Sequence, residues 1–240
     1  MAKHQALWSD IDSVLQVRIF AYDVLRRTFL QEPCKGYLQT MAEPGFIQLF
    51  PFLQENQEIY QGIHQVINYL ENNNVLDHKV YDQLHWDYTR LFIGPYQLPA
   101  PLWESAYLSE ERLLFQESTL QVRHTYAKYG FLPHQYQQEA DDHLGLELDF
   151  MYQLACLAGK KQGSDVEKLR EVVQDSQEFL QNHLLNWIPQ LTHDIKNSAT
   201  TGFYQGIAKV LDGYLQLDGA VLQELTHRIN NENLEMQEEE

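Results

Sequence analysis

The sequence of 240 residues predicts an all-α protein, and three observations lead to that prediction. Apolar residues recur every three or four positions along most of the chain, which is the spacing of a buried helix face. No run of alternating β-branched residues competes with this pattern. No segment repeats at a fixed period, which argues against a solenoid. We therefore expect one helical domain of about nine helices at residues 1–230, followed by an acidic, disordered tail at 231–240.

The first predicted helix begins at a capping box and ends at a proline. Ser9 and Asp12 have the spacing of such a box, and the apolar residues that follow lie on two faces, as in a largely buried helix. Pro33 stops this helix because proline lacks the amide hydrogen that a helix requires. Residues 34–50 contain Pro44-Gly45 and predict a short helix and a turn.

Two further helices are expected before residue 94. Pro51 can begin the first of them, and Asn72-Asn73-Asn74 ends it. Asp77 can cap the second, which continues to Phe92 and stops at Gly94-Pro95.

The second half of the chain predicts helices on both sides of a linker. Ser109 begins a helix that Gly130 ends, and the polar segment 131–140 is the expected hinge between two helical subdomains. Asp141 or Asp142 then caps a helix that continues to Ala158.

The last helices follow a second capping box. Ser164 and Glu167 form this box, apolar residues continue around Pro189, and Thr201 caps the final long helix. Gly202 and Gly206 within that helix indicate close packing against a neighbour rather than a dimer motif.

Composition excludes several classes of protein. With 34 acidic and 17 basic residues, the formal net charge of −17 repels nucleic acid and anionic membrane surfaces. No stretch approaches the ~18 uncharged apolar residues of a membrane helix, and no basic region precedes an apolar run as in a signal peptide. Cys34 and Cys156 lie too far apart in the sequence for a metal-binding spacing. We expect a cytoplasmic protein with two free thiols.

Two stretches are unusual enough to indicate a site. Residues 94–108 form a loop with three prolines that also carries Leu102 and Trp103, so it must pack against another element or expose a sticky patch. Residues 139–147 hold four carboxylates and a histidine within nine positions. We expect the two stretches to form one surface that binds a peptide, with aromatic anchors beside carboxylates.

The acidic stretch admits three interpretations. Asp141 and Asp142 can be helix caps, with His143 an ordinary first-turn residue. His143 and Glu147, with Asp142 or Glu139, can instead bind a metal, although no second histidine stands at the helical spacing. The third interpretation is an exposed acidic pocket that receives arginine, because carboxylates match a guanidinium bidentately. No phosphate-binding loop, zinc-protease or serine-hydrolase motif accompanies the stretch.

The two stretches together resemble the TorD/DmsD family of Tat redox-enzyme maturation chaperones. The resemblance rests on Leu91-Phe92, Gly94-Pro95 and Leu98 to Leu108, followed by Glu139-Ala-Asp-Asp-His143 and Glu147, and it covers roughly residues 10–230. The family's Pro-Pro-Trp segment falls on Pro101-Leu102-Trp103, where the second proline is missing. Its Glu-Pro-Asp-Asp-His falls on 139–143, where Ala140 replaces proline and is expected to soften the hinge.

The resemblance implies an all-helical cytoplasmic chaperone without enzymatic activity or cofactor. Such a chaperone binds the twin-arginine signal peptide, and the apo form, of a molybdopterin oxidoreductase of the DMSO or TMAO reductase type, and holds back export until the cofactor is inserted. We expect no nucleic acid partner and no membrane insertion, and either a monomer or a homodimer. The expected peptide-binding residues are Leu91, Phe92, Pro101, Leu102, Trp103, Glu104, Glu139, Asp141, Asp142, His143 and Glu147.

The alternative function is an all-α metal-dependent hydrolase. Its metal ligands would come from Glu139, Asp142, His143 and Glu147.

Overall fold

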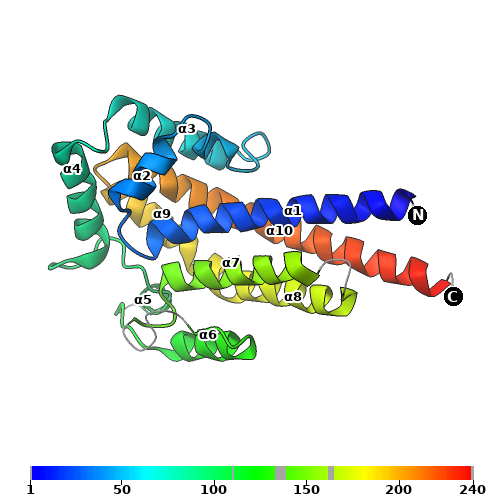
Figure 1. The fold of residues 1–240 in the computed structure, drawn as a ribbon. Helices are drawn as coiled ribbons and strands as arrows, with labels where there is room; N and C mark the ends of the chain where they lie inside the picture. The colour runs from blue at the N-terminus through cyan, green and yellow to red at the C-terminus, as the bar shows by residue number, and fades with distance from the viewer. Residues whose placement is uncertain (1, 110, 133–138, 162–164, 239–240) are drawn as a thin grey trace.

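The computed structural model describes residues 2–109, 111–132, 139–161 and 165–238. Its ordered elements are all helical, which confirms the predicted all-α fold (Figure 1). The described chain contains the segments α1 to α10, of which α5 is a single turn, against about nine predicted helices. No helix in this part of the chain is long and apolar enough to cross a membrane.

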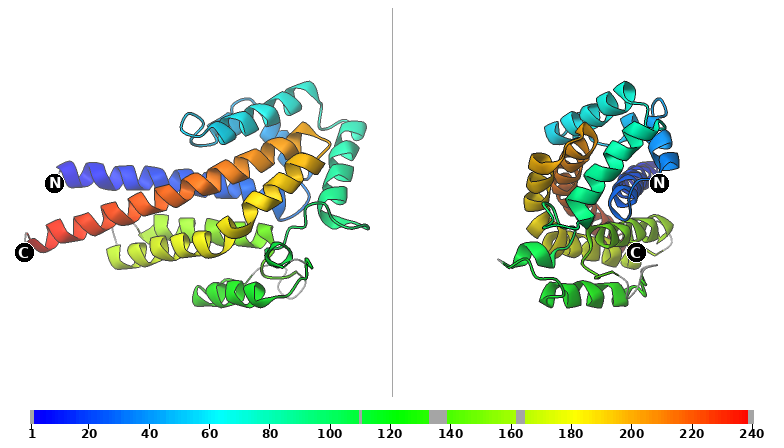
Figure 2. Two further views of the ribbon diagram at one scale, coloured as in Figure 1. Left: turned by 180° about the vertical axis from the view of Figure 1, so that it is seen from behind. Right: turned by 90° about the vertical axis from the view of Figure 1, so that its left-hand side faces the viewer.

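Two long helices form the axis of the molecule and end close together at one end (Figure 1). α10 packs against α3, α8 and α9, and α1 packs against α7. α4 crosses the opposite end, and α6 lies at the edge beyond α7 and α8 (Figure 2). The helices are α1 (Ala2–Phe29), α2 (Lys35–Ala42), α3 (Gln57–Asn72), α4 (His78–Tyr88), α5 (Ser105–Leu108), α6 (Glu117–Lys128), α7 (Leu144–Lys161), α8 (Val166–Phe179), α9 (Leu185–Ser198) and α10 (Gly202–Glu238), with the 3-10 turn η1 (Ile47–Leu49) and the π-helical turns η2 (Thr89–Ile93) and η3 (Leu180–Leu184).

Several predicted helix ends are confirmed. The side chain of Asp77 accepts hydrogen bonds from the amides of Lys79 and Val80 at the start of α4. Gly130 follows α6 with φ of 60°, a left-handed conformation that glycine adopts without strain. Thr201 accepts from the amide of Tyr204 at 3.5 Å and begins α10.

Other boundaries differ from the prediction. α1 begins at Ala2 rather than at the box at Ser9, since the helical hydrogen bonds extend upstream of it. α3 begins after Asn56, whose side chain accepts from two helix amides, and not at Pro51. The helix expected from Ser109 begins only at Glu117. Arg112 and Phe115, with φ of 50° and 59°, break the helical path between them.

The remaining boundaries lie next to residues that the structure does not describe. Asp165 caps α8 by accepting from the amide of Lys168 at 3.0 Å, whereas Ser164 of the expected box lies outside the described residues. Most of the expected hinge, residues 133–138, also lies outside them. α10 continues to Glu238, beyond the predicted end near 230, because no glycine or proline follows to stop it. Residues 239–240 of the expected tail are not described.

The packing role predicted for the glycines of α10 is confirmed at Gly206. A Cβ atom on Gly206 would lie 2.7 Å from the carbonyl oxygen of Gly62 in α3, and one on Gly62 would lie 2.6 Å from that of Gly206. The two helices therefore touch backbone to backbone at this point.

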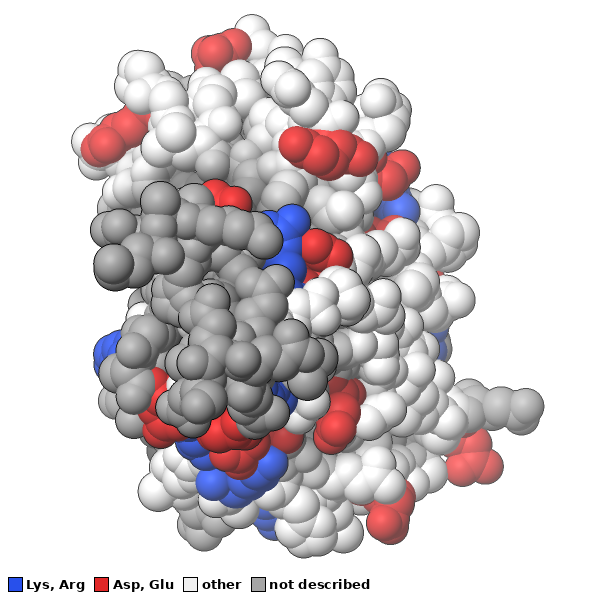
Figure 3. Space-filling view, turned by 90° about the vertical axis from the view of Figure 1, so that its right-hand side faces the viewer, with Lys and Arg blue, Asp and Glu red and all other residues white. Residues whose placement is uncertain are grey.

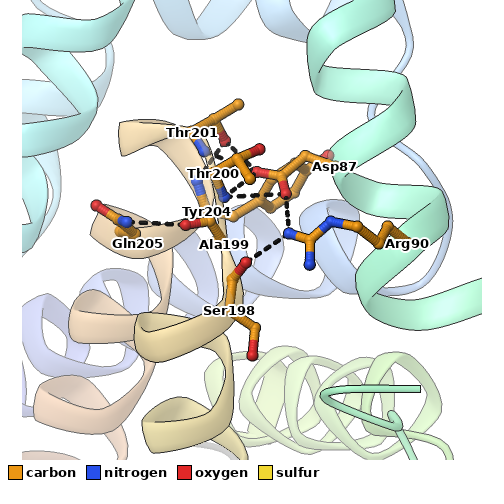
Figure 4. A network of polar contacts seen from close by, with 8 residues as sticks. All are labelled: Asp87, Arg90, Ser198, Ala199, Thr200, Thr201, Tyr204 and Gln205. Carbon is orange, nitrogen blue, oxygen red and sulfur yellow. Dashed lines mark hydrogen bonds and ion pairs between the residues drawn. The ribbon is translucent and has the colours of Figure 1, made fainter. Parts of the chain in front are cut away.

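A carboxylate joins α4 to the corner between α9 and α10 (Figure 4). Asp87 accepts from the amides of Thr200 and Thr201, from the hydroxyl of Thr201 and from the guanidinium of Arg90. This network holds α4 and the following turn η2 against the start of α10, and so it places the loop that begins at Gly94.

Candidate functional site

The two unusual stretches meet, as the sequence predicts. Trp103 and His143 form an isolated antiparallel β-bridge. The amide of Glu104 donates to the carbonyl of Asp142 at 3.0 Å, and that of Leu144 donates to Leu102 at 2.8 Å. The rings of Trp103 and His143 lie edge to face with centroids 5.5 Å apart. We call residues 101–105 and 139–143, joined in this way, the clasp.

Leu91 and Phe92 are packed beneath the loop of residues 94–108 and do not line an open groove. Both are buried, as are Pro101 and Leu102. The carbonyl of Leu91 accepts from the amide of Ala100 at 3.3 Å, and the ring of Phe92 packs against Phe29 of α1. These four side chains were expected to line a peptide groove. In the structure they are buried, because the loop folds back over its own apolar residues.

His143 caps α7, whereas Asp141 and Asp142 were the expected caps. The carbonyl of His143 accepts from the amides of Leu146 and Glu147, and its Nδ1 accepts from the amide of Gly145 at 3.1 Å. Burial lowers the pKa of His143 to about 4, an effect that the nearby Asp142 carboxylate opposes. The imidazole is therefore neutral at pH 7, and its unprotonated Nδ1 can accept the bond.

The two aspartates of the clasp serve other partners. Asp142 is fully buried and accepts from the amide of Ser105 at 2.8 Å, so it ties the two halves of the clasp together. Asp141 accepts from Nε of Arg123 on α6 at 2.6 Å. The predicted exposed pocket is therefore absent at these two carboxylates: one is inside the protein and the other already holds a guanidinium of the protein itself.

Two glutamates in or near the clasp are also buried. Glu104 is 1% exposed and lies 3.1 Å from Nδ1 of His183. Glu147 is fully buried, and neither of its carboxylate oxygens has a hydrogen-bond partner among the described residues. Burial, with the negative charges of Glu104 and Asp142, raises the pKa of Glu147 well above its usual range. Glu147 is thus held as the neutral acid, which is far less costly to bury than a carboxylate.

Trp103 and Glu139 remain at the surface of the clasp. Both are partly exposed, and Nε1 of Trp103 donates to Oε1 of Glu139 at 2.8 Å. The amide of Ala140 donates to the same oxygen at 3.1 Å. Within the described chain, Oε2 of Glu139 has no partner and the carboxylate has no lysine or arginine beside it. Of the predicted site residues, this pair alone offers an aromatic face and a carboxylate to solvent.

The geometry does not support the hydrolase. In the described part of the chain, no group of three or more His, Cys, Asp or Glu side chains could hold a metal ion. Nδ1 of His143 and Oδ2 of Asp142 are both occupied by backbone amides. These side chains are structural partners within the clasp rather than a set of open ligands.

Sequence reasoning missed three residues that build the site. Gly145 lets α7 approach α1, since a Cβ atom there would lie 2.3 Å from Cα of Leu30. Its place inside the acidic stretch was a usable signal, because glycine within a helix often marks close packing. Arg123 and His183 reach the clasp from α6 and η3, and no local pattern announces such distant partners.

The excess of negative charge is not confined to the clasp. On the face that carries the chain ends, acidic side chains are spread in separate groups, some with lysine or arginine beside them (Figure 3). Net charge alone therefore does not single out the clasp from the rest of the surface.

Comparison with known proteins identifies relatives of the chain. A profile of the nitrate reductase delta subunit family matches residues 52–193, more than half of the chain. The TorD chaperone of Vibrio parahaemolyticus is 24% identical over 81% of this chain and 89% of its own length. The TorD chaperone of Aliivibrio salmonicida is 25% identical over 88% of this chain and 96% of its own length. The Tat proofreading chaperone DmsD of Salmonella typhi is 33% identical over 50% of this chain and 53% of its own length.

Proposed function

From the premise that this chain belongs to the nitrate reductase delta subunit family and is a chaperone related to TorD and DmsD, we propose that its clasp binds a twin-arginine signal peptide. The observation that carries the proposal is the pairing of Trp103 with His143, which joins the two sequence motifs into one surface. The family and the chaperone function expected from the sequence are confirmed, and the hydrolase has no support.

The surface of the clasp offers chemistry that such a peptide requires. A signal peptide has a basic start followed by an apolar run, so it needs carboxylates beside apolar surface. Glu139 presents an oxygen without a partner among the described residues, and Trp103 presents part of its indole next to it. An arginine can share Glu139 with the indole N–H, because a carboxylate accepts about four hydrogen bonds.

The buried carboxylates act on the peptide through the clasp. Asp142 holds Ser105, and Asp141 holds Arg123, so both fix the backbone on which Trp103 and Glu139 stand. Preorganisation of this kind improves affinity because the site does not have to be ordered on binding.

The finer parts of the function are proposals that the family resemblance implies. We propose that the partner is the apo form of a molybdopterin oxidoreductase, that binding takes place in the cytoplasm, and that it delays export until the cofactor is inserted. The chaperone acts as a monomer or a homodimer. The names of its relatives, two TorD chaperones and a Tat proofreading chaperone, support a chaperone role in Tat export. The oxidoreductase partner, the cytoplasmic location and the oligomeric state are proposed from the family resemblance of the two motifs.

Peptide titration tests the proposal. Wild type should bind a signal peptide with two arginines more tightly than its two-lysine counterpart, because lysine lacks the planar fork. Trp103→Ala should weaken binding by roughly 30-fold, as expected when an anchor that contributes ~2 kcal/mol is truncated. Isothermal titration of the purified full-length protein measures both effects.

Tyr60→Ala supplies the matched control. Tyr60 is an aromatic residue on α3 that is 45% exposed and lies outside the clasp. If Trp103→Ala unfolds more readily but its folded fraction binds like Tyr60→Ala, then Trp103 is a packing residue and the proposed site is wrong.

A further inference from the structure

A cavity of about 540 Å³ lies beside α4, outside the clasp. Lys79, Trp86 and Arg90 line it from α4 and the turn η2, and Thr200 lines it from the corner between α9 and α10. Trp86 is 65% exposed, although an indole is among the most favourable side chains to bury. The cavity therefore combines a large aromatic face in water with two cations, and the proposed function uses none of these residues.

Arg90 is fixed in this cavity by one nitrogen of its guanidinium. Nη2 donates to Oδ1 of Asp87 at 2.8 Å and to the carbonyl of Ser198 (Figure 4). Nε and Nη1 have no partner in the described chain, and the side chain is 44% exposed. An anchored guanidinium with free N–H groups can bind a carboxylate with little further loss of side-chain entropy.

The other polar groups of the cavity are also open to a ligand. The ammonium of Lys79, the amide of Gln83 and the hydroxyl of Thr200 have no partner in the part of the chain that the structure describes. All three residues are exposed. The cavity thus offers charged and neutral hydrogen-bonding groups around the indole of Trp86.

Two acids in the lining limit the charge of the ligand. Asp87 is buried and accepts from four donor groups, and Oδ2 of Asp82 lies 2.7 Å from Nδ1 of His78. These two carboxylates balance the charges of Lys79 and Arg90, so the cavity suits a single carboxylate better than a polyphosphate. The sequence also lacks a phosphate-binding loop.

The exposed side of α4 extends beyond the cavity. Its exposed residues recur every three or four positions, which is the spacing of one helix face: Lys79, Gln83, Trp86, Arg90 and Ile93. Ile93 is 64% exposed, and Tyr96 in the following loop is 87% exposed. We call these residues, including Tyr96, the α4 face. At 1.5 Å per residue it is roughly 20 Å long, which fits a peptide segment better than a small molecule.

We propose that the α4 face binds an acidic, partly apolar segment of a partner protein. Trp86 is the aromatic anchor, and Arg90 and Lys79 hold a carboxylate of the segment. Tryptophan and arginine are among the residue types most enriched in the anchors of protein interfaces. Because the net charge of −17 repels an acidic segment from the rest of the surface, these cations decide where it binds.

This inference goes beyond the proposed function. A twin-arginine signal peptide begins with basic residues and needs free carboxylates, whereas both acids of this cavity already have partners. The α4 face therefore serves a second partner segment of opposite charge, on a different element from the clasp.

Isothermal titration with two short blocked peptides tests the inference. One peptide carries leucines between glutamates, and the other has glutamine in place of each glutamate. Wild type should bind the glutamate peptide about tenfold more tightly, since charge-assisted hydrogen bonds are roughly twice as strong as neutral ones. Trp86→Ala should weaken binding of both peptides about tenfold, because the anchor is truncated. Lys79→Gln should weaken binding of the glutamate peptide only, by about threefold.

Tyr60→Ala and Lys160→Gln are the matched controls. Tyr60 is 45% exposed on α3, and Lys160 is exposed near the end of α7. Both variants should bind the glutamate peptide like wild type. Because Trp86 and Lys79 are exposed, their variants should keep the thermal unfolding midpoint of wild type, which separates a loss of binding from a loss of folding.

The inference is wrong if wild type does not bind the glutamate peptide or binds both peptides equally. It is also wrong if Trp86→Ala binds like Tyr60→Ala. Binding of adenosine triphosphate that depends on Trp86, without binding of the glutamate peptide, would show a site for small anions instead. Trp86→Ala should bind the two-arginine signal peptide like wild type, and a loss there would assign the α4 face to the signal peptide.

Discussion

Asp87 and Glu147 are both buried carboxylic acids at helix junctions, but their surroundings are opposite. Asp87 accepts hydrogen bonds from two amides, a hydroxyl and a guanidinium (Figure 4). Glu147 has none within the described chain, and it lies near two other acidic residues. Asp87 therefore joins α4 to the corner between α9 and α10 through four donor groups. Glu147 avoids the penalty of a buried charge by holding its proton.

Asp142 lies between these extremes. One of its oxygens accepts from Ser105, and the other has no partner in the described residues. The three acids show that a buried carboxyl group contributes to the structure through the groups that donate hydrogen bonds to it. The comparison can be tested by removing or neutralising each acid in turn, from the largest expected effect to the smallest.

Asp87→Ala should be the most damaging change. It leaves the amides of Thr200 and Thr201 without their acceptor and removes the partner of Arg90, so the free energy of unfolding should fall by roughly 3 kcal/mol or more. Urea unfolding followed by circular dichroism measures this loss. Asp82→Ala on the same helix is the control, since its side chain is 43% exposed and should matter by at most ~0.5 kcal/mol. Equal losses for the two variants would show that the junction does not depend on Asp87.

Gly145→Ala tests the close packing of α7, the helix that carries Glu147, against the end of α1. A Cβ atom 2.3 Å from Cα of Leu30 forces α7 away from α1, and overpacking of this kind costs about 1–3 kcal/mol. Gly36→Ala in α2 is the control, because no atom lies within 4 Å of the added carbon and alanine favours a helix by up to ~1 kcal/mol. In thermal unfolding, the midpoint should be lower than that of wild type for Gly145→Ala only. A stable Gly145→Ala protein would mean that the two helices can separate without loss.

Glu147→Gln should change how stability depends on pH. Because the pKa of Glu147 is raised in the folded state, the folded protein binds more protons than the unfolded chain above the ordinary glutamate pKa of about 4.3. This group therefore makes wild type progressively less stable as pH rises from there towards the folded pKa. Glutamine removes that decline.

The measurement is the difference in unfolding free energy between the two proteins across a pH series. It should be smallest near pH 4 and grow in favour of Glu147→Gln towards neutral pH. His143 titrates in both proteins and opposes the trend in wild type, since its lowered pKa makes stability rise with pH between about 4 and 6.5. A difference that does not vary with pH would show that Glu147 is ionised in the folded protein.

Asp142→Asn should have the smallest effect on peptide binding. Asparagine still accepts from the amide of Ser105, and the side chain at 142 is fully buried, so affinity for a two-arginine peptide should change by less than about twofold. A tenfold loss, with unchanged thermal stability, would instead show that the clasp opens and that Asp142 contacts the peptide directly.

Local patterns predicted much of the fold and the meeting of the two motifs. The helical spacing, the cap at Asp77 and the glycine at 130 depend on neighbours within four residues, and the structure confirms them. The prediction that a helix starts at Ser109 is wrong, and the reason lies in the tertiary structure. Leu113, Leu114 and Phe115 are exposed in the structure, so no buried face supports a helix there.

The sequence by itself determined the fold class, the family and the stretches that form the clasp, because helix periodicity and motif order are properties of the chain. Only the tertiary structure decided which acids face water. Asp141, Asp142 and Glu147 lie within seven residues of one another, yet their environments differ. Asp141 pairs with Arg123, Asp142 accepts from Ser105, and Glu147 has no hydrogen-bond partner in the described chain. Burial and pairing depend on residues tens of positions away, so the choice of Glu139 as a candidate acceptor required the tertiary structure.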